Sequence, residues 1–83
     1  MQLGVYSLQK VLYQGEALSV NCMTRAGEIT ILDEHEPLIS MLAKGTLKII
    51  DENRQEHYIP VSSGFLEVRA GNKTKILVEE QTK

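Results

Sequence analysis

Four ionisable side chains stand next to one another near the middle of the chain. Asp33, Glu34, His35 and Glu36 follow an alternating segment and are closed by Pro37; we call these four residues the acidic loop. Carboxylates beside an imidazole could bind a metal ion or transfer protons. A metal ion needs donors that converge on one point, whereas neighbouring residues of a strand or turn mostly point apart. From these residue types alone, a solvated loop is favoured over a metal site or a catalytic centre.

The remaining polar residues also make weak candidates for chemistry. His57, the second histidine, lies far away in the sequence, and no two close ligand pairs resemble a zinc site. Ser62, Ser63 and Gly64 lack the earlier glycine and the paired base of a nucleophile elbow. A domain this small is also expected to hold little volume for a substrate pocket. We therefore predict no catalytic residue, no metal and no cofactor.

Length and charge narrow the class of protein further. The chain has 83 residues, which predicts a single domain near the lower size limit for unaided folding. Its net charge is -2 and its nine Lys and Arg residues are spread out, so nucleic acid is not expected as a partner. Cys22 is the only cysteine and fits a buried apolar position, which favours a reducing compartment. Because no signal peptide and no spanning apolar run is found, we expect no direct membrane insertion.

Apolar and polar residues alternate along most of the chain, which predicts an all-β domain. The segment 37–42 has no firm period, so a strand and a short helical turn both stay open there. Pro60 lacks a ladder donor and predicts an edge strand or a bulge. We expect eight to nine short strands in two packed antiparallel sheets. The expected segments are 3–7, 11–13, 18–23, 28–32, 37–42, 46–50, 57–61, 65–69 and 74–79.

The order of these pieces resembles the epsilon subunit of F-type ATP synthase over nearly the whole chain. The pieces that carry the resemblance are GEITILDEHEPL at 27–38, the alternating GTLKI at 45–49 and SSGFLEV at 62–68. The family's N-terminal domain is a flattened β-sandwich, which agrees with the strand pattern. The resemblance therefore implies one antiparallel sandwich domain over residues 1–83.

The resemblance also implies a function. Family members are non-catalytic rotor subunits of the central stalk, peripheral to the cytoplasmic face of the cell membrane, that help to couple ion flow to ATP synthesis. They bind the gamma subunit on one side and the polar loops of the c-ring on another, and act only indirectly on the alpha/beta catalytic head. Matching positions put Glu28, Asp33, Glu34, His35 and Glu36 against the c-ring. Other matching positions put Ser7, His35 and Ser40 towards gamma.

The sequence departs from the family pattern in two places, and both bear on the contacts that the resemblance implies. Relatives commonly have Gly, Pro and Gly where this chain has Thr30, Asp33 and Glu34. The sequence given stops at Lys83, where many relatives continue into a two-helix domain that senses ATP and inhibits the enzyme. We therefore expect no C-terminal helical domain and no ATP binding. The alternative interpretation is an unrelated small β-sandwich that serves as a protein–protein interaction module.

Overall fold

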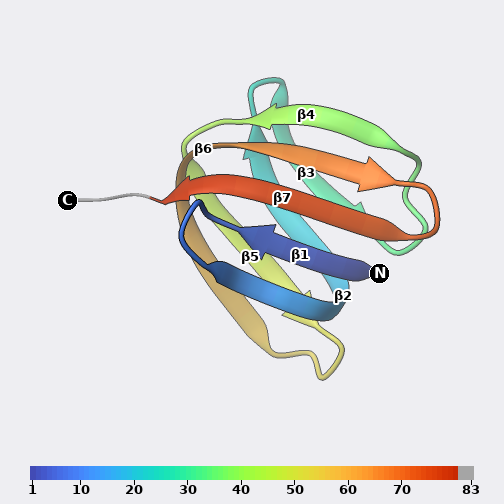
Figure 1. The fold of residues 1–83 in the computed structure, drawn as a ribbon. Helices are drawn as coiled ribbons and strands as arrows, with labels where there is room; N and C mark the ends of the chain where they lie inside the picture. The colour runs from blue at the N-terminus through green and yellow to red at the C-terminus, as the bar shows by residue number, and fades with distance from the viewer. Residues whose placement is uncertain (81–83) are drawn as a thin grey trace.

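Residues 1–80 are described in the computed structural model, and they form seven β-strands in one compact domain (Figure 1). The strands are β1 (Gln2–Tyr6), β2 (Val11–Thr24), β3 (Gly27–Leu32), β4 (Leu38–Leu42), β5 (Gly45–Asp51), β6 (Glu56–Arg69) and β7 (Lys73–Glu80). The described part of the chain holds no helix long and apolar enough to cross a membrane. The prediction of an all-β domain is confirmed, and the segment left open becomes the strand β4.

The expected count of eight to nine strands is wrong because two long strands each unite two expected ones. β2 pairs with β1 over its first half and with β3 and β5 over its second half. β6 likewise pairs with β5 first and then with β4 and β7. The register slips between Ala17 and Ser19 in β2 and between Val61 and Ser63 in β6. Such bulges bend a strand without ending it, so each long strand pairs with different neighbours along its two halves.

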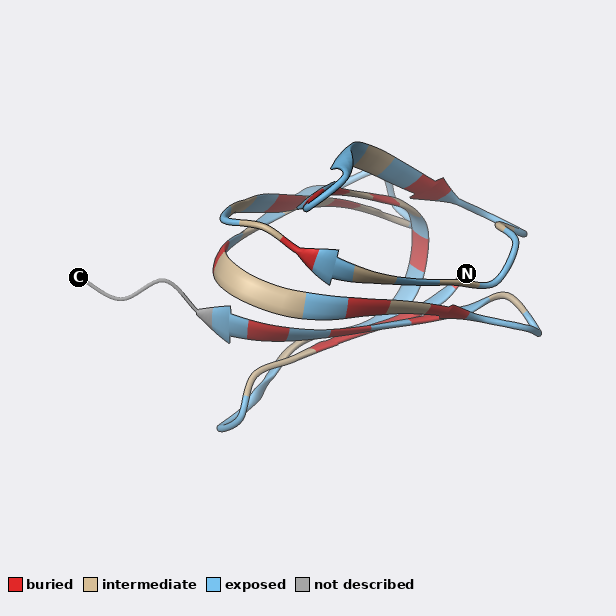
Figure 2. Cartoon of the chain, turned by 90° about the horizontal axis from the view of Figure 1, so that it is seen from above, coloured by how far each residue is buried: buried red, intermediate tan, exposed pale blue. Residues whose placement is uncertain are grey.

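The strands form one hydrogen-bonded sheet that folds over onto itself (Figures 1 and 2). The neighbour order is β1-β7-β6-β4-β2-β3; β5 pairs with β2 and β6, and β1 also pairs with β2. Every pair is antiparallel except β1 with β7, which is parallel. The expectation of a purely antiparallel sandwich is therefore wrong at one place, where the first and last strands lie side by side.

The core lies between the folded halves of the sheet, where buried and exposed residues alternate along the strands (Figure 2). Leu3 and Val5 of β1 belong to this core cluster, as do Ile76 and Val78 of β7, and the strand register pairs Val5 with Ile76. Cys22 is fully buried within it, as its apolar surroundings in the sequence predicted. Alternation with a period of two thus leaves a second, outward face on β1, β6 and β7 that is free for other roles.

Two residues of β6, Pro60 and Gly64, lie at or near the break that was expected between segments 57–61 and 65–69. A Cβ atom at position 64 would lie 2.5 Å from the carbonyl oxygen of Leu77, so only glycine lets β7 approach this closely. Among the described residues, Pro60 lies in the half of β6 that pairs with β5 alone, next to the bulge. The prediction that Pro60 marks an edge or a bulge is confirmed.

Candidate functional site

The acidic loop connects β3 to β4 and is tied to two distant parts of the chain. Oδ1 of Asp33 accepts hydrogen bonds from the Met1 amine at 2.5 Å and from Nδ2 of Asn72 at 2.9 Å. Oδ1 of Asn72 in turn accepts a hydrogen bond from the backbone N–H of Glu34 at 2.8 Å. The loop is therefore fastened to the start of β1 and to the turn between β6 and β7.

Both partners of the bond between Glu34 and Asn72 have left-handed backbone, each with a φ of 61°. Asparagine tolerates this region, whereas glutamate adopts it only at a steric cost. Glycine at position 34 would avoid this cost. The loop therefore carries backbone strain at Glu34.

The charges of the loop are divided between internal and external roles. The hydrogen bond from the Met1 amine, followed by that from Asn72, lowers the pKa of the Asp33 carboxyl. Burial lowers the pKa of the Met1 amine, but the bond to Asp33 and the charges of Asp33 and Glu16 raise it on balance. Within residues 1–80, neither Glu34 nor Glu36 forms an ion pair. These two exposed carboxylates are the ones available to a partner.

The structure does not gather the other predicted contact residues into one patch. Glu28 is the second residue of β3 and the acidic loop follows the end of that strand, so roughly 16 Å separates Glu28 from the loop. Ser7 follows β1 at the opposite end from the acidic loop, and its hydroxyl accepts weak bonds from backbone N–H groups of the same turn. Ser40 lies in β4 on the same side as the buried Leu42. The predicted gamma contacts at Ser7 and His35 thus lie at opposite ends of the domain.

Metal ligation finds little support in the geometry. No group of three His, Cys, Asp or Glu residues within positions 1–80 is placed to hold a metal ion. Nε2 of His57 lies 2.8 Å from Oδ2 of Asp51, whose other oxygen accepts backbone hydrogen bonds from Asn53 and Gln55. The ring of Tyr13 packs edge-on against His57 at 5.2 Å between centroids. This cluster fixes the hairpin between β5 and β6.

Sequence reasoning missed a row of exposed apolar side chains across the outer face of the sheet. Strand register places Met41 opposite Phe65, Phe65 opposite Leu77 and Leu77 opposite Tyr6. Met41, Phe65 and Leu77 are 50%, 37% and 46% exposed; we call these three residues with Tyr6 the apolar row. Ile39, the neighbour of the row on β4, is also exposed. The missing period of segment 37–42 was the available signal, because it reflects a strand that is apolar on both faces.

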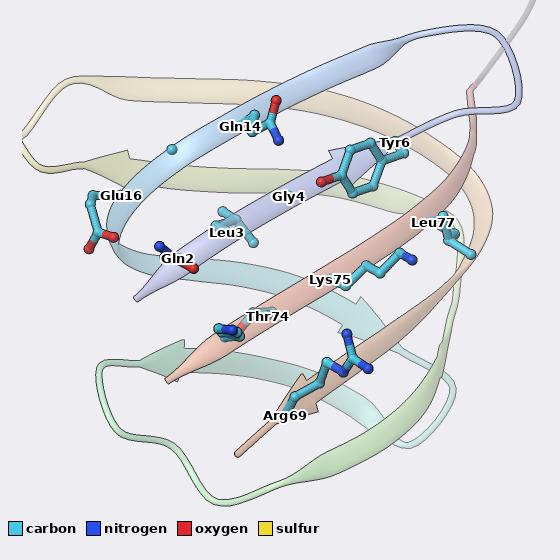
Figure 3. A pocket seen from close by; sticks show the side chains of 12 residues that line it. Gln2, Leu3, Gly4, Tyr6, Gln14, Glu16, Arg69, Thr74, Lys75 and Leu77 are labelled. Carbon is cyan, nitrogen blue, oxygen red and sulfur yellow. The ribbon is translucent and has the colours of Figure 1, made fainter. Parts of the chain in front are cut away.

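A hollow lies beside the apolar row, over β1 and β7 and the adjoining parts of β2 and β6 (Figure 3). Its volume is about 740 Å³. The floor includes Gly4, which Tyr6 covers so closely that a Cβ atom there would lie within 3 Å of the ring. Gly4 of β1 and Gly15 of β2, which lie on neighbouring strands, are both among the residues that line this hollow.

A small all-β domain with an outward apolar row and a fastened charged loop is typical of a protein-binding domain. Residues 1–83 match the model of the family described as ATP synthase, Delta/Epsilon chain, beta-sandwich domain. The chain belongs to this family.

Relatives at the sequence level agree with this assignment. The ATP synthase epsilon chain of Bordetella petrii is 40% identical over 74 residues, which cover 89% of this chain and 52% of the relative. The ATP synthase epsilon chain of Brevibacillus brevis is 38% identical over 79 residues, 95% of this chain and 59% of the relative. The chain thus spans little more than half the length of these relatives.

Solved structures share the fold. A chain of the Euglena gracilis mitochondrial ATP synthase (OSCP/F1/c-ring) superimposes with a TM-score of 0.87 at 23% identity, covering 94% of this chain and 49% of that one. A chain of the Tetrahymena thermophila mitochondrial ATP synthase central stalk and c-ring gives a TM-score of 0.81 at 19% identity, covering 95% and 63%. At these identities the likeness establishes a common fold.

Proposed function

We propose that this chain is a non-catalytic central-stalk domain of an F-type ATP synthase, which joins the gamma subunit to the c-ring. The observation that carries the proposal is the apolar row, which gives a domain with a net charge of -2 an outward face suited to a protein partner. Its place would be peripheral, at the cytoplasmic face of the membrane, where ring rotation driven by ion flow is passed to the catalytic head.

The apolar row is the proposed gamma-binding surface. Apolar and aromatic residues dominate the buried centre of protein interfaces, and Phe65 stands in the middle of the row. Ser7 directly follows Tyr6 in the chain, and Ser40 lies between the exposed Ile39 and Met41. Ser7 is thus next to the row in the chain, whereas Ser40 lies on the opposite face of β4, on the side of the buried Leu42.

The acidic loop is the proposed c-ring-binding surface. Glu34 and Glu36 can face the basic loops expected on the ring, and such rim charges set orientation while adding about 1 kcal/mol or less each. His35 belongs to this loop, so we assign it to the proposed ring contact. The loop is bonded to Met1 at the start of β1, whereas Tyr6 of the apolar row ends that strand, and this separation leaves room for both partners at once.

Co-expression with the cognate gamma subunit tests the first surface. We expect a one-to-one complex on gel filtration, and we expect Phe65→Ser to weaken it more than tenfold because a central interface residue is lost. Tyr58→Ser is the matched control, since Tyr58 is an exposed aromatic residue of β6 away from the row. Equal behaviour of the two folded variants, or two separate peaks for the unmodified proteins, would contradict the gamma assignment.

Charge reversal tests the second surface. The double change Glu34→Lys and Glu36→Lys should release the domain from ring-containing membranes while the gamma complex survives. Glu52→Lys, in the hairpin between β5 and β6, controls for charge alone. Glu28→Lys reports whether the ring contact extends along β3. Parallel loss of gamma and ring binding in the double variant would show that the surfaces are wrongly divided.

A further inference from the structure

The hollow beside the apolar row concentrates positive charge in an otherwise acidic domain. Arg69 of β6 is directly opposite Lys73 of β7, and Lys75 follows two residues later on the same outer face. Figure 3 shows Arg69 and Lys75 extended over the face that also carries Tyr6. Nζ of Lys75 lies 6.0 Å from the centroid of the Tyr6 ring. Three cations from two neighbouring strands therefore border one concavity.

These cations are only partly compensated within the domain, because one carboxylate, Glu67, is directly opposite Lys75 in the strand register and also contacts Arg69. Among the described residues, Lys73 and Lys75 form no ion pair, and Arg69 has a single contact of 3.7 Å to Glu67. Glu16, the acidic residue that lines the hollow, has its carboxylate 3.6 Å from the Met1 amine. Arg69 and Lys73 carry like charges directly opposite each other on neighbouring strands, and such charges repel each other. An anionic partner would relieve this repulsion.

We propose that this hollow binds an extended acidic segment of a partner polypeptide. Lys73 and Lys75 are two residues apart on one strand, roughly 7 Å, which is the spacing of alternate side chains in an extended peptide. The amides of Gln2 and Gln14 can exchange hydrogen bonds with the backbone of the segment. Leu77 supplies an apolar contact at the end of the hollow that meets the apolar row.

The dimensions favour a peptide over a small anion. A volume of about 740 Å³ lies within the range of ligand pockets of 300–1,000 Å³ and far exceeds the needs of one carboxylate or phosphate group. The lining is mixed, with cations along β6 and β7, amides on β1 and β2 and an aromatic ring between them. Such a lining suits a chain with alternating carboxylates and a polar backbone, and it makes this surface separate from the acidic loop.

An NMR titration of the ¹⁵N-labelled chain tests the proposal. The probe is an acetylated and amidated hexapeptide in which glutamate alternates with serine. We expect saturable shifts of backbone amides in β1 and β7, and weaker binding when the salt concentration rises from 50 to 200 mM. The double variant Lys73→Gln and Lys75→Gln should bind about tenfold more weakly. The control variant Arg25→Gln and Lys44→Gln removes the same charge from distant turns and should bind like the parent.

Three results would overturn the proposal. One is the absence of saturable shifts in β1 and β7 with the unmodified chain. Another is equal weakening in the two double variants, which would mean non-specific attraction. The third is tighter binding of MgATP than of the peptide at the same amides, which would make the hollow a nucleotide site. Should the Lys73 and Lys75 double variant fail to fold, as judged by its own amide spectrum, Lys75→Gln alone is compared with Lys44→Gln on the same criteria.

Discussion

Replacing Glu34 by glycine should stabilise the domain, because Glu34 holds a φ of 61° in the acidic loop. For a residue with a Cβ atom, this left-handed conformation costs about 1–2 kcal/mol relative to the usual regions. Glycine adopts it without that cost. The main fixed contact of Glu34, the bond from its backbone N–H to Oδ1 of Asn72, survives the substitution because it uses no side-chain atom.

The size of the effect follows from two opposing terms. Relief of strain contributes about 1–2 kcal/mol, whereas the greater freedom of glycine in the unfolded chain removes about 0.5–1 kcal/mol. The side chain of Glu34 is exposed and makes no ion pair with the described residues, so its loss costs little. The net gain is about 0.5–1 kcal/mol, which raises the Tm of a domain of this size by about 2–8 °C.

Thermal unfolding followed by circular dichroism measures this gain. Glu36→Gly is the matched control, since it removes the same charge from the same loop at a residue without a positive φ. The control should lower Tm because it adds freedom to the unfolded chain and relieves no strain. If Glu34→Gly lowers Tm as much as Glu36→Gly does, backbone strain at Glu34 is not a real property of the loop.

Other parts of the domain give further expectations. Gly64→Ala should destabilise the domain by about 2 kcal/mol or more in urea unfolding, because its Cβ would meet the backbone of β7; an unchanged midpoint would contradict that close approach. Hydrogen bonds from His57 first, and then from the hairpin backbone, lower the pKa of Asp51. Its contribution to stability is therefore present above the unfolded pKa of about 3.9 and lost as the pH falls through the folded pKa, so Asp51→Asn should flatten the urea midpoint between pH 5 and 2. Burial raises the pKa of the Cys22 thiol to about 11, and an aromatic disulfide reagent should modify it only as fast as the domain opens.

Periodicity predicted the local elements well and the long-range arrangement poorly. Alternating residues located most strands, and they placed Cys22 in the core. Each of the long strands β2 and β6 was predicted as two separate strands. A β-bulge continues a strand, but in the sequence it resembles a break between two strands. The parallel pairing of β1 with β7 was missed because it joins residues more than 70 positions apart. The local alternation of residues does not show which distant strands pair.

The candidate surfaces were predictable to different degrees. The acidic loop was located from residue types, but its fastening through Asp33 depends on Asn72 and the Met1 amine, which only the fold brings close. The apolar row and the hollow arise from register across four strands, so no single segment of sequence contains them. Tyr6 is an example of what the sequence alone does not predict. Its ring covers Gly4 on the same strand, and it belongs both to the apolar row and to the lining of the hollow.

The parallel pairing of β1 with β7 has a mechanical consequence. Its two strands run in the same direction, so the beginning of β1 and the end of β7 lie at opposite ends of the shared ladder (Figure 1). Tension applied between these ends loads the hydrogen bonds from Gln2 to Tyr6 together, in shear, and does not peel them apart one by one. Strands at the two ends of the described chain thereby form a clamp, and resistance to pulling should exceed that of a hairpin with the same number of bonds.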